Sequence, residues 1–163
     1  MIVIAVAGFM AMVAVPALLN QVRTSRMSAA ARKIATDTQE ARWRAVRTGW
    51  QFRIVGYGNA ATTNKNKYRL LGRSSTAVSW PADTAAVTST TTQVAQAWVD
   101  FGQLYPQVKL NNGITANGGR FYVSFDARGA AFERQAVAPL VVLGQNNKTR
   151  NMNVAAIGSV VLQ

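Results

Sequence analysis

The sequence predicts an α+β fold, in which a long N-terminal helix is docked on an antiparallel, β-sandwich-like head. Met1–Leu19 is almost entirely apolar, and Gln21–Arg47 is rich in helix-forming residues with neither Pro nor Gly. The remainder consists of short strand-like runs divided by Gly, Asn and Pro. We therefore expect residues 1–20 to form a transmembrane or filament-core half of the helix, 21–48 its amphipathic half, and 49–163 a β-rich globular head.

The first helix half has the length and composition of a membrane-inserting segment. Met1–Leu19 carries no charged side chain, and as a helix it spans about 28 Å, close to the hydrocarbon thickness of a bilayer. Its apolar residues cover every face, which argues against a buried core helix, and no basic n-region marks it as a secretory signal peptide. Pro16 removes a helical hydrogen bond and predicts a kink near Met12–Val15.

The second helix half carries a stripe of mostly small residues at helical spacing. This docking stripe consists of Met27, Ala30, Ala31, Ile34, Thr38, Ala41 and Ala45. Small side chains allow close approach, so we expect the stripe to pack against a sheet. Most of the basic residues lie off the stripe, and Gly49 is the predicted C-cap, with Arg47 in the last turn.

Short strands are expected throughout the head. They are Gln51–Tyr57, Lys67–Leu71, Gln107–Leu110, Arg120–Phe125, Ala130–Arg134, Leu140–Gly144, Arg150–Ile157 and Ser159–Leu162. Turns are expected at residues 111–113, 126–129 and 146–148. The Thr-, Ser- and Ala-rich stretch Ser74–Gln96 is expected to be a long loop.

Composition argues against an enzyme and against a metal or cofactor site. The chain has no Cys and no His, so the usual metal ligands and the usual neutral-pH base are missing. Only six carboxylates are present, at Asp37, Glu40, Asp83, Asp100, Asp126 and Glu133. Asp37 and Glu40 share a helix face among basic residues, and we interpret them as surface ion-pair partners.

The positive charge is concentrated in the first half of the chain. The net charge is +12, and the residues up to Arg73 carry 12 basic and 2 acidic side chains. Such a balance favours anionic lipid headgroups, nucleic acid or acidic proteins, although a solvated basic face has the same composition. The candidate polyanion-binding residues are Arg53, Lys65, Lys67, Arg69, Arg73, Lys148 and Arg150, with the aromatic Trp50, Tyr57 and Tyr68 interleaved.

An apolar helix interrupted by proline, continuous with an amphipathic helix and followed by a β-rich head, resembles a type IV pilin or a type II secretion pseudopilin. Three local features resemble the FimT/GspH-like minor pilins. They are the helix end Ala41-Arg42 with Ala45 and Arg47-Thr48-Gly49, the hairpin Phe125-Asp126-Ala127-Arg128-Gly129, and Gly158 near the C-terminus.

The resemblance implies a structural subunit, without cofactor or catalysis, that assembles into a type IV pilus or a type II secretion pseudopilus. Its implied partners are other pilin or pseudopilin subunits, the bacterial inner membrane, the assembly platform and the prepilin peptidase. The implied assembly-helix residues are Gly8, Ala11, Ala14, Pro16 and Ala17, whose small size suits close helix packing. The resemblance also implies that the head lies in the periplasm before the subunit is assembled.

Two features depart from the family pattern. Pilins of this kind begin with a short basic leader, followed after cleavage by an aromatic residue and a glutamate, and none of these is present. Counted back from Pro16 the apolar helix is about 9 Å short, so we expect the leader and glutamate to lie upstream of Met1. The basic residues that follow the apolar run place the head in the cytoplasm by the positive-inside rule, but the expected leader would balance them.

Two alternative functions fit the same sequence. One is a DNA-binding minor pilin used in DNA uptake, with DNA as an additional partner. The Gly-Arg-x-Arg tail that some FimT-like proteins use for DNA is replaced here by Gly158-Ser159-Val160-Val161, so that site does not carry over. The other is a membrane-anchored β domain that never polymerises.

Overall fold

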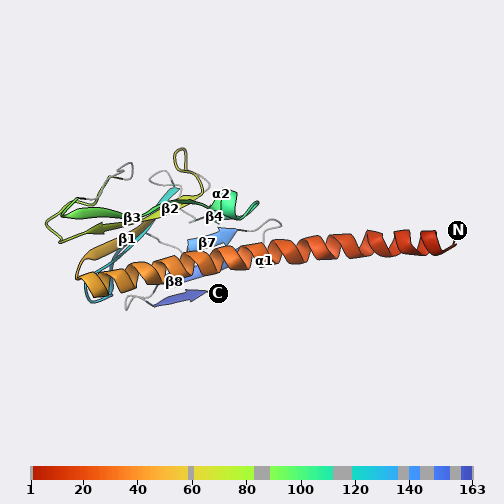
Figure 1. Cartoon of the computed structure of the whole chain (residues 1–163), viewed down its shortest axis with the longest axis horizontal. Helices are drawn as coiled ribbons and strands as arrows, with labels where there is room; N and C mark the ends of the chain where they lie inside the picture. The colour runs from red at the N-terminus through yellow and green to blue at the C-terminus, as the bar shows by residue number, and fades with distance from the viewer. Residues whose placement is uncertain are drawn as a thin grey trace.

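The computed structural model describes residues 2–58, 61–82, 89–111, 119–135, 140–143, 149–154 and 159–162 (Figure 1). For residues 2–11 and 13, and for several strand residues of the C-terminal half, it describes the backbone alone. The molecule is a long helix whose C-terminal half carries a compact head, while its N-terminal half projects away from the head (Figure 1).

The helix α1 (Ile2–Thr48) is continuous over 47 residues. It passes through Pro16 without a break, and Figure 1 shows no sharp bend there, so the predicted kink is not seen. Within the described residues, no helix combines the length and the apolarity needed to cross a membrane.

The end of α1 follows the rule for a glycine cap. Gly49 has a φ of +72°, and its amide donates to the carbonyl oxygen of Ala45 at 3.0 Å. A left-handed residue at this point ends the helix and satisfies a carbonyl that has no helical partner. The chain then turns directly into the first strand.

A five-stranded antiparallel sheet forms the larger part of the head. Its strands, in spatial order, are β3 (Thr92–Asp100), β2 (Lys67–Arg73), β1 (Gln51–Tyr57), β5 (Arg120–Phe125) and β6 (Ala131–Gln135). The central strand pairs Ile54 with Leu70 on one side and with Val123 on the other. These three side chains point to the same face and belong to the core.

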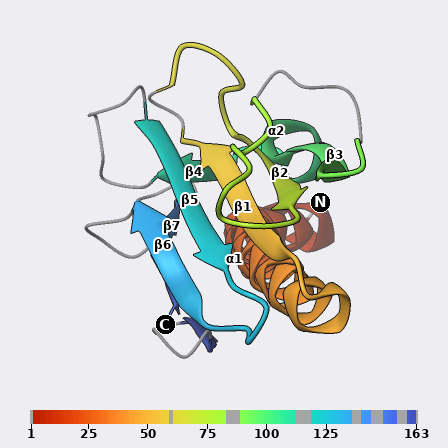
Figure 2. The same ribbon diagram turned by 90° about the vertical axis from the view of Figure 1, so that its left-hand side faces the viewer.

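A second antiparallel sheet of four strands completes the head. Its order is β4 (Lys109–Asn111), β7 (Leu140–Leu143), β8 (Thr149–Val154) and β9 (Val160–Leu162). The short helix α2 (Phe101–Leu104) connects β3 to the segment before β4, and Asp100 caps it by accepting from the Gln103 amide. Strands of both sheets contact α1, so one helix is the common packing partner of the two sheets (Figure 2).

The predicted α+β class, with a long N-terminal helix and an antiparallel sheet, is confirmed. Strands at Gln51–Tyr57 and Arg120–Phe125 have the predicted bounds. The predicted loop Ser74–Gln96 is wrong at its end, because β3 begins at Thr92. This edge strand is half-buried along most of its length, so its sequence lacks the alternation that marks a strand with one buried face.

The helix α2 was not predicted, because its four residues are too few to show helical periodicity. The predicted turn at residues 146–148 lies outside the described residues, as does most of the turn at 111–113. Gly158 also lies outside them.

The core lies between α1 and the inner faces of the sheets. Large side chains of the five-stranded sheet, including Phe52, Tyr68 and Phe125, pack with the alanines of α1. Ala30, Ala41 and Ala45 are completely buried. The apolar contact between helix and sheet therefore combines aromatic side chains on the sheet with methyl groups on the helix.

Ala41→Leu tests this contact. The added side-chain volume has no space at the interface, and overpacking of this kind costs about 1–3 kcal/mol of folding free energy. Ala29→Leu, at an exposed position of the same helix, is the matched control and should change stability by less than about 0.5 kcal/mol. Thermal unfolding of the full chain in mild detergent, followed by near-ultraviolet circular dichroism, measures both. Equal effects of the two substitutions would contradict this packing.

Candidate assembly surface

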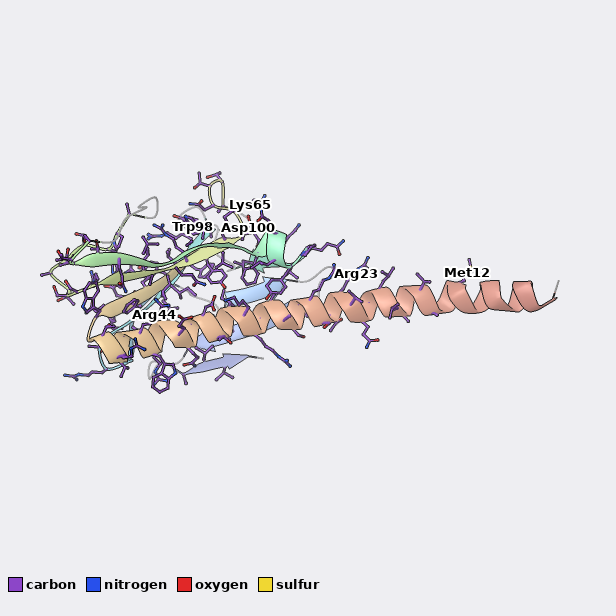
Figure 3. The ribbon with its side chains drawn as sticks, in the orientation of Figure 1. Met12, Arg23, Arg44, Lys65, Trp98 and Asp100 are labelled. Carbon is purple, nitrogen blue, oxygen red and sulfur yellow. The ribbon has the colours of Figure 1, made fainter. Side chains whose placement is uncertain are left out.

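The N-terminal half of α1 presents apolar side chains that contact no other element of the described chain. Met12 is 77% exposed and Leu18 is 63% exposed, and the small residues Ala14, Pro16 and Ala17 between them are exposed as well. Met12 projects from the bare helix in Figure 3. The side chains of Gly8 and Ala11 lie outside the described residues.

The bare part of the helix is long. Among the α1 residues whose side chains are described, Met27 is the first buried one, and the 25 helical residues before it have a length of about 37 Å at 1.5 Å per residue. Helices are only marginally stable in water without packing, and a helix that is apolar on all sides is stable when other apolar groups surround it. The stretch from Ala14 to Leu19, which is apolar and exposed, is therefore a candidate contact surface for apolar groups from outside the described residues.

The docking stripe lies in the interface between α1 and the head. All seven of its members are buried, and they are Met27, Ala30, Ala31, Ile34, Thr38, Ala41 and Ala45. The one polar member, Thr38, donates its hydroxyl to the carbonyl oxygen of Ile34 at 2.7 Å. This bond within the helix satisfies the hydroxyl, so its burial carries little penalty.

One carboxylate is buried in the same interface. Asp37 is only 3% exposed, so its interpretation as a surface ion-pair residue is wrong. It accepts from the Lys33 ammonium group at 2.7 Å and from the Tyr68 hydroxyl at 2.5 Å. The sequence pattern showed only its basic neighbours on the helix, and the tyrosine partner is supplied by β2. Glu40 is exposed and pairs with Arg44 at the helix surface, as predicted.

These contacts hold Tyr68 in its neutral form. Burial, followed by the hydrogen bond to Asp37, raises the pKa of Tyr68 well above its usual value. The neutral hydroxyl donates to Asp37, and ionisation would place two negative charges side by side. The pair therefore fixes β2 to α1 over the ordinary pH range.

The helix-end and hairpin motifs meet in space although they are 87 residues apart. Arg42 donates through Nε to the carbonyl oxygen of Gly129 at 3.1 Å. Gly129 has a φ of +79°, and a Cβ atom there would lie 2.9 Å from the side chain of Val46. The hairpin turn therefore needs glycine both for its backbone conformation and for its close approach to α1.

The aspartate of the hairpin motif shapes this turn. Asp126 accepts through Oδ1 from the amides of Arg128 and Ala130, at 3.0 and 2.8 Å. A second bond joins the Asp126 amide to the Ala130 carbonyl, and Phe125 anchors the turn in the core. Each fixed residue of the Phe-Asp-x-x-Gly pattern thus has a separate physical role.

Three of the candidate polyanion-binding residues are buried on the outer face of the five-stranded sheet. Arg53, Arg69 and Arg73 are between 2 and 7% exposed. The guanidinium carbons of Arg53 and Arg73 lie 4.1 and 4.3 Å from the centre of the Trp80 ring. Burial lowers the pKa of Arg53, and the nearby Glu133 opposes this shift. These side chains hold residues 74–82 against the sheet and do not form an open phosphate-binding surface.

Of the other candidate residues, only Lys65 and Lys67 have side chains that the structure describes. Lys65 is exposed, and Lys67 pairs with Asp100 at 3.3 Å. Lys148 lies outside the described residues, as does the side chain of Arg150. The interleaved aromatic residues are also engaged, since Tyr68 is in the core and Tyr57 packs on Trp98 with ring centres 5.9 Å apart.

The structure also shows a groove that the sequence did not indicate. It lies between the last turns of α1 and the starts of β1 and β3, and has a volume of about 800 Å³. The residues of this helix-end groove are Glu40, Trp43, Arg44, Val46, Arg47, Thr48, Phe52 and Gln93. Trp43, on the opposite side of α1 from the docking stripe, is 69% exposed. Its position off the docking stripe was the available signal.

No group of three or more acidic, His or Cys side chains in the described part of the chain is placed to hold a metal ion. Comparisons with protein families, with curated proteins and with solved structures find no match to this chain. The features that bear on function are therefore the projecting half of α1, the packing of the docking stripe against the head, and the helix-end groove.

Tyr68→Phe tests the buried polar contact. The change leaves Asp37 buried with one donor fewer, which costs about 1–3 kcal/mol. Tyr105→Phe removes a hydroxyl from the same aromatic cluster but keeps the bond to Asp37, and should cost less than about 0.5 kcal/mol.

The same variants give a pH test. A folded-state pKa raised above the unfolded value contributes stability below the unfolded pKa, and that stability is lost as pH rises beyond it. The stability difference between wild type and Tyr68→Phe should therefore narrow above about pH 10, the ordinary tyrosine pKa. Denaturant unfolding between pH 7 and 11 measures it, and a constant difference would contradict the raised pKa.

Gly129→Ala tests the contact between the hairpin and the helix. We expect a loss of more than about 1 kcal/mol, because strain at positive φ is added to the clash with Val46. Gly49→Ala is the matched control, since it has a similar φ but no atom within 4 Å of the new Cβ. Adding Val46→Ala to Gly129→Ala should restore the stability that Gly129→Ala loses beyond the loss in Gly49→Ala. No recovery, measured by thermal unfolding, would show that the clash is not the cause.

Proposed function

We propose that this chain is a structural subunit of the FimT/GspH-like minor pilin or pseudopilin kind. In this proposal the N-terminal half of α1 is held in the bacterial inner membrane, with the head in the periplasm. The subunit then assembles with others into a type IV pilus or a type II secretion pseudopilus. The observation that carries the proposal is the exposed apolar half of α1, which extends beyond the head and has no partner in the described chain.

The helix α1 has an exposed N-terminal half and a C-terminal half that packs against the head, and this division suits the proposed role. Transfer from a membrane to a filament exchanges lipid contacts for helix–helix contacts, which small residues such as Ala14 and Ala17 favour. The head is expected to stay out of that exchange, because the buried docking stripe that holds it to α1 begins at Met27. One rigid helix can therefore leave the lipid while the head stays folded.

The meeting of the two local motifs gives further support. The resemblance rested on the Ala-Arg helix end and on the Phe-Asp-x-x-Gly hairpin as separate short patterns. In the structure, Arg42 of the first bonds to Gly129 of the second. Two weak patterns that depend on each other physically are better support for a shared architecture than either pattern alone.

The DNA-binding alternative receives less support. It relied on a surface of basic and aromatic side chains, but Arg53, Arg69 and Arg73 are buried in contacts within the head. The non-polymerising membrane anchor has the same fold as the proposed subunit, so only an assembly measurement separates the two.

Cysteine cross-linking tests assembly directly, because the chain has no native Cys. Met12→Cys and Ala14→Cys place thiols on nearly opposite faces of the projecting helix. In cells that naturally produce the protein, the double variant should give a ladder of cross-linked species larger than a dimer with a maleimide–diazirine reagent, which joins a thiol to any neighbouring chain whether or not that chain has a Cys. Each single variant should give nothing beyond a dimer.

Adding Ala11→Glu, near the middle of residues 1–20, to the double variant should abolish the ladder, because a charge at the centre of an inserted helix costs about 3 kcal/mol. Thr62→Glu, at an exposed head position, should leave it intact. A double variant that stops at dimers would contradict assembly and favour the simple anchor.

A further inference from the structure

The carboxylates of this chain are already engaged within the chain. Five of the six lie among the described residues, and each has an internal partner. Asp37 bonds to Lys33 and Tyr68, Glu40 to Arg44, Asp100 to Lys67, Asp126 to the amides of its own turn, and Glu133 to Arg53 and Arg73. A second copy of the chain therefore offers few acceptors to a basic surface.

The basic side chains are in large excess and many are exposed. The chain contains eighteen Lys and Arg residues and only six Asp and Glu residues. Exposed members on α1 and on the head include Arg26, Arg32, Arg47, Lys65, Lys109 and Arg128. Two copies packed through such surfaces would repel each other, because like charges at a contact cost free energy. An interface at this basic surface therefore favours a partner chain that is richer in acidic residues than this chain.

The helix-end groove is where such a partner can bind. Trp43 is 69% and Val46 is 46% exposed, and they form an apolar patch on the polar side of α1. Exposed Trp and Arg residues are typical of the energetically important part of a protein interface. A solvated helix face does not need a tryptophan at this position.

The rim of the groove determines the charge of the partner. Arg44 donates hydrogen bonds to the Glu40 carboxylate and to the carbonyl oxygen of Ala95 on β3. Its guanidinium group is therefore already paired within the wall of the groove. Arg47 is exposed in the last helical turn, and Arg128 is exposed in the hairpin turn that packs against Val46. An apolar patch with one exposed arginine in its lining and a second on the adjacent hairpin turn is complementary to a segment with an apolar anchor and flanking carboxylates.

We propose that the helix-end groove binds an acidic segment of a different subunit of the heteropolymer that the proposed function already implies. The proposal rests on the assembly function above and adds the partner's chemistry and its binding site. Apolar contact with Trp43 and Val46 supplies affinity, and carboxylates beside Arg47 and Arg128 supply selection against a second copy of this chain.

Site-specific photocross-linking in the natural host tests this. p-Benzoyl-phenylalanine replaces Trp43 in the full chain, and mass spectrometry identifies the cross-linked peptide. We expect a peptide from a different protein, with Asp and Glu in excess over Lys and Arg. The same photoreactive residue at Ala29, which is exposed but distant from the groove in the chain, should not capture that peptide.

Charge reversal provides the matched comparison. Arg47→Glu with Arg128→Glu should lower the cross-linked fraction at least tenfold. Arg26→Glu with Arg32→Glu makes the same change in net charge away from the groove and should lower it less than twofold. Thermal unfolding of each variant verifies that the head remains folded.

Several results would overturn the proposal. They are capture of a second copy of this chain, capture of nucleic acid, capture of a peptide without acidic excess, or no capture at position 43. If the Met12 and Ala14 cysteine ladder still forms in those cases, only the inference about the groove fails. If the ladder is also missing, the assembly function fails with it.

Discussion

The close contact between the alanines of α1 and the head is the constraint on which the rest of the structure depends. Both sheets pack against the same helix, and Ala30, Ala41 and Ala45 are completely buried there. Small helix side chains allow Phe52, Tyr68 and Phe125 to fill the interface from the sheet side. Larger residues on the helix would push the sheet away and separate the hairpin from Arg42.

A surface made of methyl groups holds two elements together but does not fix their alignment well. The polar contacts supply the alignment. Asp37 meets Tyr68 of β2 near the middle of the interface, and Arg42 meets Gly129 of the β5–β6 turn near its end. A helix shifted by one turn would leave the Asp37 carboxylate buried without its tyrosine, at a large cost. Two polar bonds at separate points therefore select one register from several that the alanines would tolerate.

The sequence predicted the elements whose pattern follows from a single buried face. The docking stripe of the helix and the strand β5 are of this kind, whereas the glycine cap and β1, which is buried on both faces, were predicted from residue type and from the turn residues around them. It did not predict β3, because that edge strand is half-buried along most of its length and contains Gln and Ala. The candidate site was predicted only where it depends on periodicity, as in the docking stripe. The basic residues were misjudged because a count of charges does not show that Arg53 and Arg73 stack on Trp80 and pair with Glu133.

The contact between Asp37 and Tyr68 has a mechanical consequence. If the chain assembles as proposed, a load along the filament would act along the axis of α1, and the head is attached to the side of that helix. Such a load would shear the interface parallel to the helix, so the polar bonds of Asp37 and Arg42 would bear it together. Attachments loaded in shear break only when several bonds fail at once, whereas peeling breaks them one by one. The hydrogen bond between the buried Asp37 carboxylate and Tyr68 would thus resist sliding of the head along α1.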